Sequence, residues 1–209
     1  MIDTHSHINM IEGLSPEEII KNAEDNGIDK IIVPSAYPSD IDDIMKLTDK
    51  YENVYGMLGV HPSEAKSWDD SLIDKIRECA KNKKIVAVGE IGLDYYWDKS
   101  FNDLQKEVFI KQIQLANELN LPIDIHDREA HKDTFDIIQE YNKGSKVIMH
   151  CFSGSTEFAR ECVKAGYYLG IGGVVTFKNA VKMKEVVKAV PLKRILLETD
   201  APYLTPVPF

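Results

Sequence analysis

The chain has 209 residues, 44% of them hydrophobic, and a formal net charge of -9, which together predict one globular domain spanning residues 1–209. This charge disfavours proteins that coat nucleic acid irrespective of sequence, because such binding needs lysines and arginines to neutralise phosphates. No leader pattern opens the sequence and no apolar run approaches the roughly 18 residues of a membrane span, so we expect a cytoplasmic protein without membrane contact.

Short apolar stretches typical of strands alternate with amphipathic stretches typical of helices along the whole chain. The expected strands cover residues 1–7, 29–35, 54–61, 85–93, 122–126, 146–152, 168–175 and 194–199. The first expected helix follows Ser15, with Pro16 at its first position, Glu18 completing a capping box and Gly27 just past its end. The later helices are expected over residues 40–51, 71–81, 102–120, 129–141, 155–165 and 180–190.

Eight strands that alternate with helices predict a parallel sheet and, at this length, the α/β fold of a TIM-type (β/α)8 barrel. The last expected strand is followed by the proline-rich residues 201–209, which have no helical pattern, so we expect the last C-terminal helix to be lacking. Such a barrel exposes an apolar strip beside its first and seventh helices. We expect either that the chain is truncated or that a partner covers this strip.

Metal-binding residue types follow the predicted strands at one end of the barrel. His5 and His7 close the first strand, where a side-chain period of two points both rings to the same side. Later strands end in His61, Glu90 with Asp94 beyond it, His126, His150 and Asp200. Parallel barrels form their active sites at the C-terminal ends of the strands, so these side chains are expected to meet.

The mixture of ligand types favours a binuclear centre. Four imidazoles and two carboxylates are too many for one tetrahedral ion, but they suit two ions about 3.5–4 Å apart that share a carboxylate. We therefore expect two divalent metal ions as cofactors, with a metal-bound hydroxide as the nucleophile of a hydrolase. Imidazole favours Zn, Mn, Co or Ni, whereas Mg prefers oxygen, so the ligand set leaves the metal open.

Six segments, in this order along the chain, resemble the TatD-type deoxyribonucleases, a family of metal-dependent amidohydrolase-like barrels. The segments are Asp3-Thr4-His5-Ser6-His7, Gly59-Val60-His61-Pro62, Gly89-Glu90-Ile91-Gly92-Leu93-Asp94-Tyr95, Ile125-His126-Asp127-Arg128-Glu129-Ala130, His150-Cys151-Phe152-Ser153-Gly154 and Glu198-Thr199-Asp200-Ala201-Pro202-Tyr203. The resemblance implies one metal held by His5, His7 and Asp200. It implies a second metal held by His126 and His150, with Glu90 bridging the two.

The resemblance also implies a substrate. The expected activity is that of a deoxyribonuclease of the 3′–5′ exonuclease type, with DNA as partner, as single strands or at 3′ ends. Asp200 is placed to accept a proton from the attacking water and Glu90 to hold the metal pair together, so both are predicted catalytic residues. His61 is a predicted substrate contact. Arg128 is another, through its fork of donors, although an ion pair with a neighbouring carboxylate would explain it equally well.

Several residues near these ligands have expected supporting roles. Asp94 is a candidate acceptor for a ligand histidine, whereas His131 is expected in or near a helix without a special role. Asp3, Asp124 and Glu198 each precede a ligand by two positions and are expected to orient the histidines or carry protons away.

The three cysteines, Cys79, Cys151 and Cys162, lack Cys-x-x-Cys spacing and are expected to be reduced and structural. Cys151 follows His150, so alternation would turn its thiol away from the site into packing. Among the aromatic residues 95–97, one ring or more is expected to anchor the loop and another to stack on a base. Lys178 is a further candidate for a phosphate contact.

Two alternatives remain open from the sequence. The same binuclear centre would serve a deacylase or amidohydrolase, because an activated water also attacks the carbonyl of a C–N or ester bond. The second alternative is a non-catalytic fragment, or a subunit whose barrel a partner completes.

Overall fold

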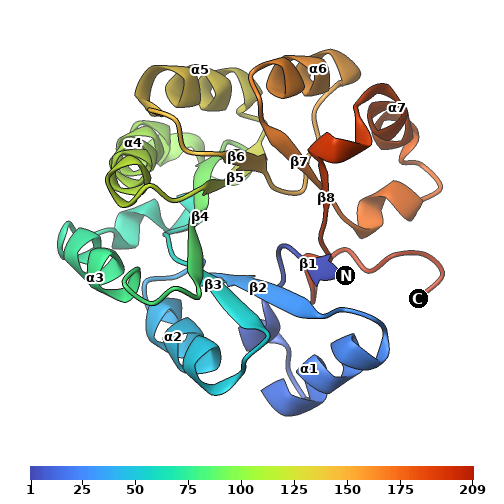
Figure 1. Ribbon diagram of the computed structural model, residues 1–209. Coiled ribbons are helices and arrows are strands. Elements are labelled where there is room, and N and C mark those ends of the chain that lie inside the picture. The colour runs from blue at the N-terminus through green and yellow to red at the C-terminus, as the bar shows by residue number, and fades with distance from the viewer.

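Eight parallel strands form a nearly closed barrel in the computed structural model, which describes residues 1–209 (Figure 1). The strands follow one another around the sheet in sequence order, and every paired neighbour is parallel. They are β1 (Ile2–Asp3), β2 (Lys30–Pro34), β3 (Val54–Met57), β4 (Ile85–Asp94), β5 (Ile123–Arg128), β6 (Val147–Met149), β7 (Tyr168–Ile171) and β8 (Ile195–Leu197). The predicted TIM-type α/β fold is confirmed.

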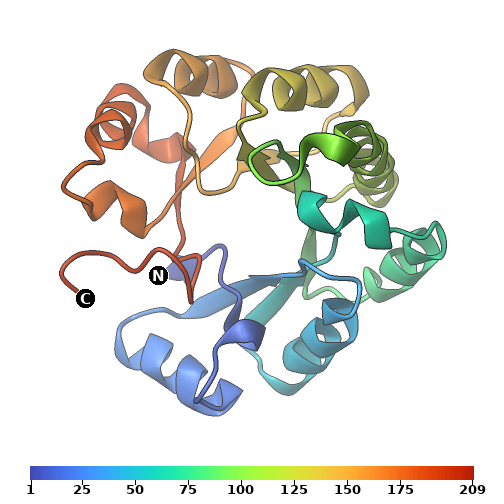
Figure 2. The ribbon, with the colours of Figure 1, turned by 180° about the vertical axis from the view of Figure 1, so that it is seen from behind.

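Seven α-helices surround the strands, one in each connection from β1 to β8 (Figures 1 and 2). They are α1 (Pro16–Asp25), α2 (Asp40–Lys50), α3 (Ser71–Cys79), α4 (Asn102–Leu119), α5 (His131–Tyr141), α6 (Thr156–Lys164) and α7 (Val181–Ala189). The capping box between Ser15 and Glu18 begins α1 as predicted. Helix α5 begins at His131, later than expected, because Glu129 has a left-handed φ of 55° that interrupts helical geometry. None of the helices is long and apolar enough to cross a membrane.

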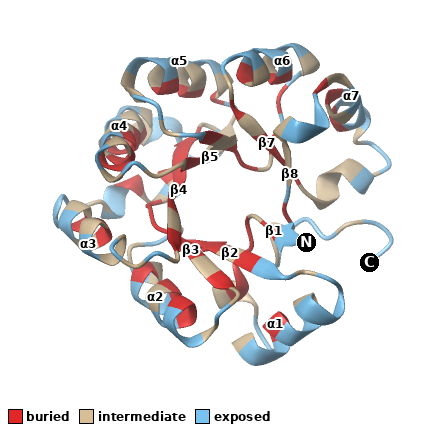
Figure 3. Cartoon of the chain, in the orientation of Figure 1, coloured by how far each residue is buried: buried red, intermediate tan, exposed pale blue.

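Two buried hydrophobic clusters, of 21 and 15 residues, lie between the strands and the helices (Figure 3). Strand β5 shows how the strands divide their side chains. Ile123 and Ile125 belong to the larger cluster, whereas Asp124 and His126 alternate with them and point towards the other side of the sheet. The period of two therefore separates the core from the polar residues that the barrel gathers inside.

Six strands end earlier than predicted, whereas β4 ends one residue later and β5 two residues later. β1 ends at Asp3, so His5 and His7 lie in the irregular segment after it and not on a strand. Ser6 N still donates to Ile32 O of β2 at 3.1 Å, and His7 N donates to Ala201 O at 2.8 Å, in the segment after β8. Likewise, β6 ends at Met149, before His150. The predicted ends of these strands were therefore wrong, whereas the predicted place of the histidines at the C-terminal ends of the strands was correct.

β8 meets β1 through few hydrogen bonds. Thr4 N donates to Leu197 O at 3.1 Å, and Asp200 N donates to His5 O at 3.0 Å. No α-helix follows β8 within residues 198–209. Ile2 and Leu197 are 47% and 56% exposed, so apolar side chains are uncovered at this seam as expected.

Candidate metal centre

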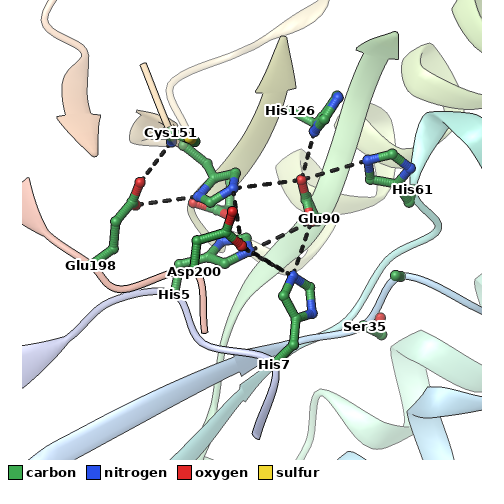
Figure 4. Close-up of polar contacts among 12 residues, drawn as sticks. His5, His7, Ser35, His61, Glu90, His126, Cys151, Glu198 and Asp200 are labelled. Carbon is green, nitrogen blue, oxygen red and sulfur yellow. Dashed lines mark hydrogen bonds and ion pairs between the residues drawn. The ribbon is translucent and has the colours of Figure 1, made fainter. Parts of the chain in front are cut away.

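Glu90 of β4 lies at the centre of the predicted ligands (Figure 4). Its Oε1 is 2.8 Å from His126 Nδ1. Its Oε2 is 3.5 Å from His5 Nε2 and 3.7 Å from His7 Nε2. One carboxylate therefore faces ligands from β5 and from the segment after β1, which is the arrangement that a bridging role requires.

The first predicted metal set comes together as a compact group. The Nε2 atoms of His5 and His7 are 3.2 Å apart, and Asp200 Oδ1 lies 3.9 Å and 3.6 Å from them. These three side chains offer ligand atoms that all lie within 4.8 Å of one another. Two ring nitrogens facing each other beside a carboxylate suit a shared cation better than a shared hydrogen bond.

The second predicted set does not form one compact group: His126 groups with His61 and Glu90, whereas His150 groups with residues of the first set or with Cys151 and Asp200. His150 Nε2 is 3.9 Å from Glu90 Oε1 and also 3.9 Å from Asp200 Oδ1, so its ring lies between the two sets. It stacks on His5 with ring centroids 3.4 Å apart. His61 is also close to this set, with its Nε2 3.7 Å from Glu90 Oε1.

Three buried carboxylates each face the ring nitrogen of one candidate ligand. The pairs are Asp124 with His5 Nδ1 at 2.8 Å, Asp94 with His126 Nε2 at 3.0 Å, and Glu198 with His150 Nδ1 at 3.3 Å. Such pairs fix which nitrogen carries the proton and how the ring is turned. The predicted supporting roles of Asp94, Asp124 and Glu198 agree with these contacts, although Asp124 orients a histidine on the far side of the barrel.

The expectation that Asp3 orients a histidine ring is wrong. Its carboxylate accepts hydrogen bonds from Thr199 N at 2.9 Å and from Thr199 Oγ1 at 2.6 Å. Because β1 ends at Asp3, the following residues turn away and leave its side chain facing the segment after β8. Asp3 therefore joins the first and last parts of the barrel.

Two glycines make room for the supporting contacts. Gly92 has a φ of 144°, and a Cβ there would lie 2.0 Å from His126 O. A Cβ at Gly170 would lie 2.2 Å from the Glu198 carboxylate. Side chains at these positions would displace His126 or Glu198, so the glycines of β4 and β7 help to position the site.

Charges within the site shift several pKa values. Burial opposes the charge of His5, but Asp124 and then Glu90 outweigh it and raise its pKa well above the ordinary value. His126 is likewise buried, yet hydrogen bonds with Asp94 and Glu90 raise its pKa to about 9. Burial and the charge of His5 lower the pKa of His7 to about 4. The negative charge of Glu90 therefore favours positive charge on His5 and His126, as it would favour a bound cation.

The donor set fits divalent cations. The His5 Nδ1–H and the His126 Nε2–H donate to carboxylates, which leaves His5 Nε2 and His126 Nδ1 facing Glu90 as ligand atoms. His7 Nδ1 is buried without a hydrogen-bond partner. Buried polar atoms of this kind cost free energy unless the group has another purpose, such as binding an ion.

His61 differs from the other rings in its protonation. Ser63 N donates to its Nδ1 at 3.1 Å, so Nδ1 carries no proton. Burial and the neighbouring His126 charge lower the pKa of His61 to about 3, which keeps the ring neutral with its proton on Nε2. An Nε2–H can donate a hydrogen bond to a substrate. The same ring also offers a nitrogen within 4.8 Å of ligand atoms of Glu90 and His126, so this position suits a metal as well.

A cavity of about 610 Å³ opens over the candidate ligands. Arg128 lines it, and no carboxylate of the chain pairs with its guanidinium, so the alternative of an ion pair is not observed. Lys178 does not line this cavity. Tyr37, Ser153 and Tyr203 also line the cavity, although none of them was a predicted site residue. For Tyr203, its position three residues after Asp200 could have indicated a place near the site.

Cys151 also lines the cavity and does not simply pack away from it. Its left-handed φ of 41° ends the alternation that was expected to turn it outwards. Burial and the charges of Glu198 and Asp200 raise the pKa of its thiol, which keeps it protonated and argues against a nucleophile.

Residues 2–209 match the sequence profile of TatD-related DNases. A metal-dependent hydrolase of Bacillus subtilis, YabD, is 46% identical over 213 residues, covering 100% of this chain and 83% of that protein. A 3′-5′ ssDNA/RNA exonuclease TatD of Shigella flexneri is 31% identical, covering 91% of this chain and 74% of the relative.

The fold agrees with these similarities in sequence. The crystal structure of YjjV, a TatD homologue from Escherichia coli, superposes with a TM-score of 0.92 at 32% identity, covering 100% of this chain and 82% of that one. The chain therefore belongs to the TatD-related DNase family, whose members are metal-dependent hydrolases of the amidohydrolase superfamily.

Proposed function

We propose that this metal-dependent hydrolase is a nuclease that cleaves phosphodiester bonds of single-stranded DNA from its 3′ end. The observation that carries the proposal is a guanidinium without an acid partner in the same cavity as a candidate metal centre. Arg128 lines the same cavity as Glu90 and His126 and forms no ion pair. His61 presents an Nε2–H beside Glu90. These donors suit an anionic substrate such as a phosphodiester better than a neutral amide.

A relative gives independent support for this substrate. The Shigella flexneri protein is named as an exonuclease of ssDNA and RNA, and it aligns with 91% of this chain. We therefore take single-stranded nucleic acid as the substrate class and the 3′ end as the site of attack.

We assign the two metals as the residue chemistry suggests. His5, His7 and Asp200 would hold one divalent ion, His126 and His150 the other, and Glu90 would contact both. Bound there, the ions would supply an acidified water and an electrophile for the phosphorus centre.

The chain's own residues manage protons and charge around that centre. Burial, partly offset by the charges of His150 and His5, raises the pKa of Asp200, which makes this carboxylate a better acceptor for a proton of the attacking water. His61 Nε2–H is placed to donate to a phosphate oxygen. Arg128 at the mouth would neutralise a second phosphate.

The test is cleavage of 3′-labelled single-stranded DNA by metal-reconstituted protein, beside the variants His5→Ala and Asp200→Asn. We expect the parent to release labelled mononucleotide and both variants to lose most activity. Asp103→Asn is a matched control, since Asp103 is exposed and forms no side-chain contact. Cleavage by the variants at the parental rate would refute the site, and turnover of amide or ester substrates alone would refute the nuclease.

A further inference from the structure

Two exposed rings and a half-buried arginine form a group at the mouth of the cavity, which we call the arginine–aromatic cluster: Tyr96, Trp97 and Arg128. The Arg128 guanidinium lies 3.8 Å from the centroid of the Tyr96 ring and 5.4 Å from that of Trp97. The two rings meet edge to face, 4.7 Å apart at 85°. Tyr96 is 46% exposed and Trp97 is 70% exposed, so the hydrophobic core does not explain their position.

The cluster is built on the strands that supply Glu90 and His126. Asp94, the last residue of β4, pairs in register with Arg128, the last residue of β5. The Asp94 carboxylate accepts a hydrogen bond from Tyr96 N at 2.9 Å and faces His126 Nε2 at 3.0 Å. One carboxylate therefore fixes both a candidate metal ligand and the loop that carries the two exposed rings.

A second anchor keeps this loop in place. Tyr95 N donates to Arg128 O at 2.9 Å, and the Tyr95 hydroxyl donates to Asp133 Oδ2 at 2.9 Å. The Tyr95 ring packs against the larger hydrophobic cluster, so Tyr95 is the predicted loop anchor. Its neighbours Tyr96 and Trp97 are thereby held in the solvent, and a preorganised surface loses little entropy when a ligand binds.

Trp97 stands on the wall between two cavities. It lines the cavity of about 610 Å³ that contains Glu90 and His126. It also lines a neighbouring cavity of about 250 Å³ that includes Lys66 and Phe101. A chain-like substrate that extends from the candidate metals in this direction must pass the indole ring.

We propose that the arginine–aromatic cluster is a nucleotide subsite, in which Trp97 stacks on the base next to the scissile phosphate and Arg128 binds the adjoining phosphate. This inference rests on the proposed nuclease function and names the residues that would select single strands. An exposed indole offers a flat face that any unpaired base can use, whereas a paired base in a duplex cannot present its face. The guanidinium, which stacks on Tyr96, keeps its N–H donors free for phosphate.

The main test compares two single-stranded substrates that differ only at the nucleotide next to the scissile phosphate. This nucleotide carries its base in one substrate and is abasic in the other. Stacking on one aromatic ring is worth about 5-fold to 150-fold per base, so the parent should prefer the intact substrate in kcat/KM by such a factor. In Trp97→Ala the ratio of kcat/KM for the intact substrate to that for the abasic substrate should fall towards one. In Trp97→Phe, which keeps an aromatic ring, this ratio should stay close to the parental value. Leu192→Ala, which shortens a remote side chain that is 83% exposed, is the control and should keep the parental ratio.

Stacking of a base on Trp97 can also be measured without turnover, by tryptophan fluorescence. The chain has two tryptophans, Trp68 and Trp97, so Trp68→Phe leaves Trp97 as the only indole. Without added metal, a thymidine oligonucleotide should quench its fluorescence, and the matching abasic oligonucleotide should quench it far less.

The outcomes separate the subsite from the nuclease activity. An intact-to-abasic ratio near one in the parent, or an unchanged ratio in Trp97→Ala, overturns the subsite while cleavage still supports the nuclease. Base-dependent quenching by a protein that cleaves no DNA overturns the nuclease and keeps the subsite. Equal quenching by the two oligonucleotides overturns the subsite.

Discussion

The candidate metal centre and the arginine–aromatic cluster use the same pair of strands, β4 and β5, but they are held in different ways. Around Glu90 the contacts are polar and buried: Glu90 is 3% exposed and His5 is fully buried. At the mouth, Arg128 and Trp97 are held by stacking and remain accessible to solvent.

This difference separates two tasks. Buried charges in a low dielectric interact strongly and depend on one another, so a change at one ligand should disturb the whole centre. Stacked side chains at the surface depend mainly on their own neighbours. We therefore expect changes near Glu90 to alter metal binding, and changes near Arg128 to alter the preference for substrate.

The largest effect is expected for Glu90→Gln, which keeps the shape of the side chain but removes the charge that faces His5, His7 and His126. The loss of kcat/KM should exceed the about 100-fold that a supporting residue can cost, and bound metal should fall as measured by elemental analysis. Glu12→Gln, at an exposed position outside the site, serves as the control. Full metal content and activity in Glu90→Gln would contradict the bridging role.

Metal affinity should rise with pH. Hydrogen bonds with Asp94 and Glu90 raise the pKa of His126 to about 9 against the opposing effect of burial, so at neutral pH a cation must displace this proton. Below that pKa the affinity should increase roughly tenfold for each pH unit, and level off above it. Calorimetric titrations in buffers with different heats of ionisation should detect the released proton. A pH-independent affinity would show that His126 does not exchange its proton for metal.

The two buried aspartates Asp124 and Asp3 give a matched pair. Asp124→Asn removes the acceptor that orients His5, and should lower metal affinity by about 10-fold to 100-fold. Asp3→Asn weakens the contacts with Thr199, so it should lower the free energy of unfolding by about 1–3 kcal/mol with a smaller change in metal affinity. Equilibrium metal titration and urea unfolding of both variants measure this contrast. Equal losses of affinity would show that the two carboxylates have the same role.

The smallest effect is expected at the mouth. For cleavage of single-stranded DNA, we compare the slope of log kcat/KM against the logarithm of the salt concentration. In Arg128→Ala the magnitude of this slope should fall by about 0.7, because one phosphate contact is lost. Arg128→Lys should keep most of that slope. Lys178→Ala is a control of like charge, because Lys178 does not line the cavity. A slope unchanged in Arg128→Ala and reduced in Lys178→Ala would place the phosphate path elsewhere.

The order of strands and helices was predictable from the sequence because it depends on local patterns. Alternating apolar stretches and the cap at Ser15 report the nearest neighbours in the chain, and the eight strands and α1 formed as expected. The ends of the strands were not predictable in the same way. Whether His7 continues a strand depends on Ala201, a residue at the other end of the chain, which accepts its backbone hydrogen bond.

The candidate ligands could also be named from the sequence, because each is a rare residue type at the end of a predicted strand. The carboxylates that orient these ligands could not be assigned to their rings in the same way. Asp124 orients His5, which lies 119 positions away in the chain, although the strand pattern linked it with His126. Asp3 shares the same pattern and instead joins β1 to Thr199.

The sequence by itself determined the barrel, the polar residues at its C-terminal end and the resemblance to one family of hydrolases, because periodicity and residue type are local properties. Only the tertiary structure decided which carboxylate orients which ring, and that Arg128 stacks on Tyr96 instead of pairing with an acid. These are contacts between strands, and barrel closure fixes them through distances that no stretch of sequence contains.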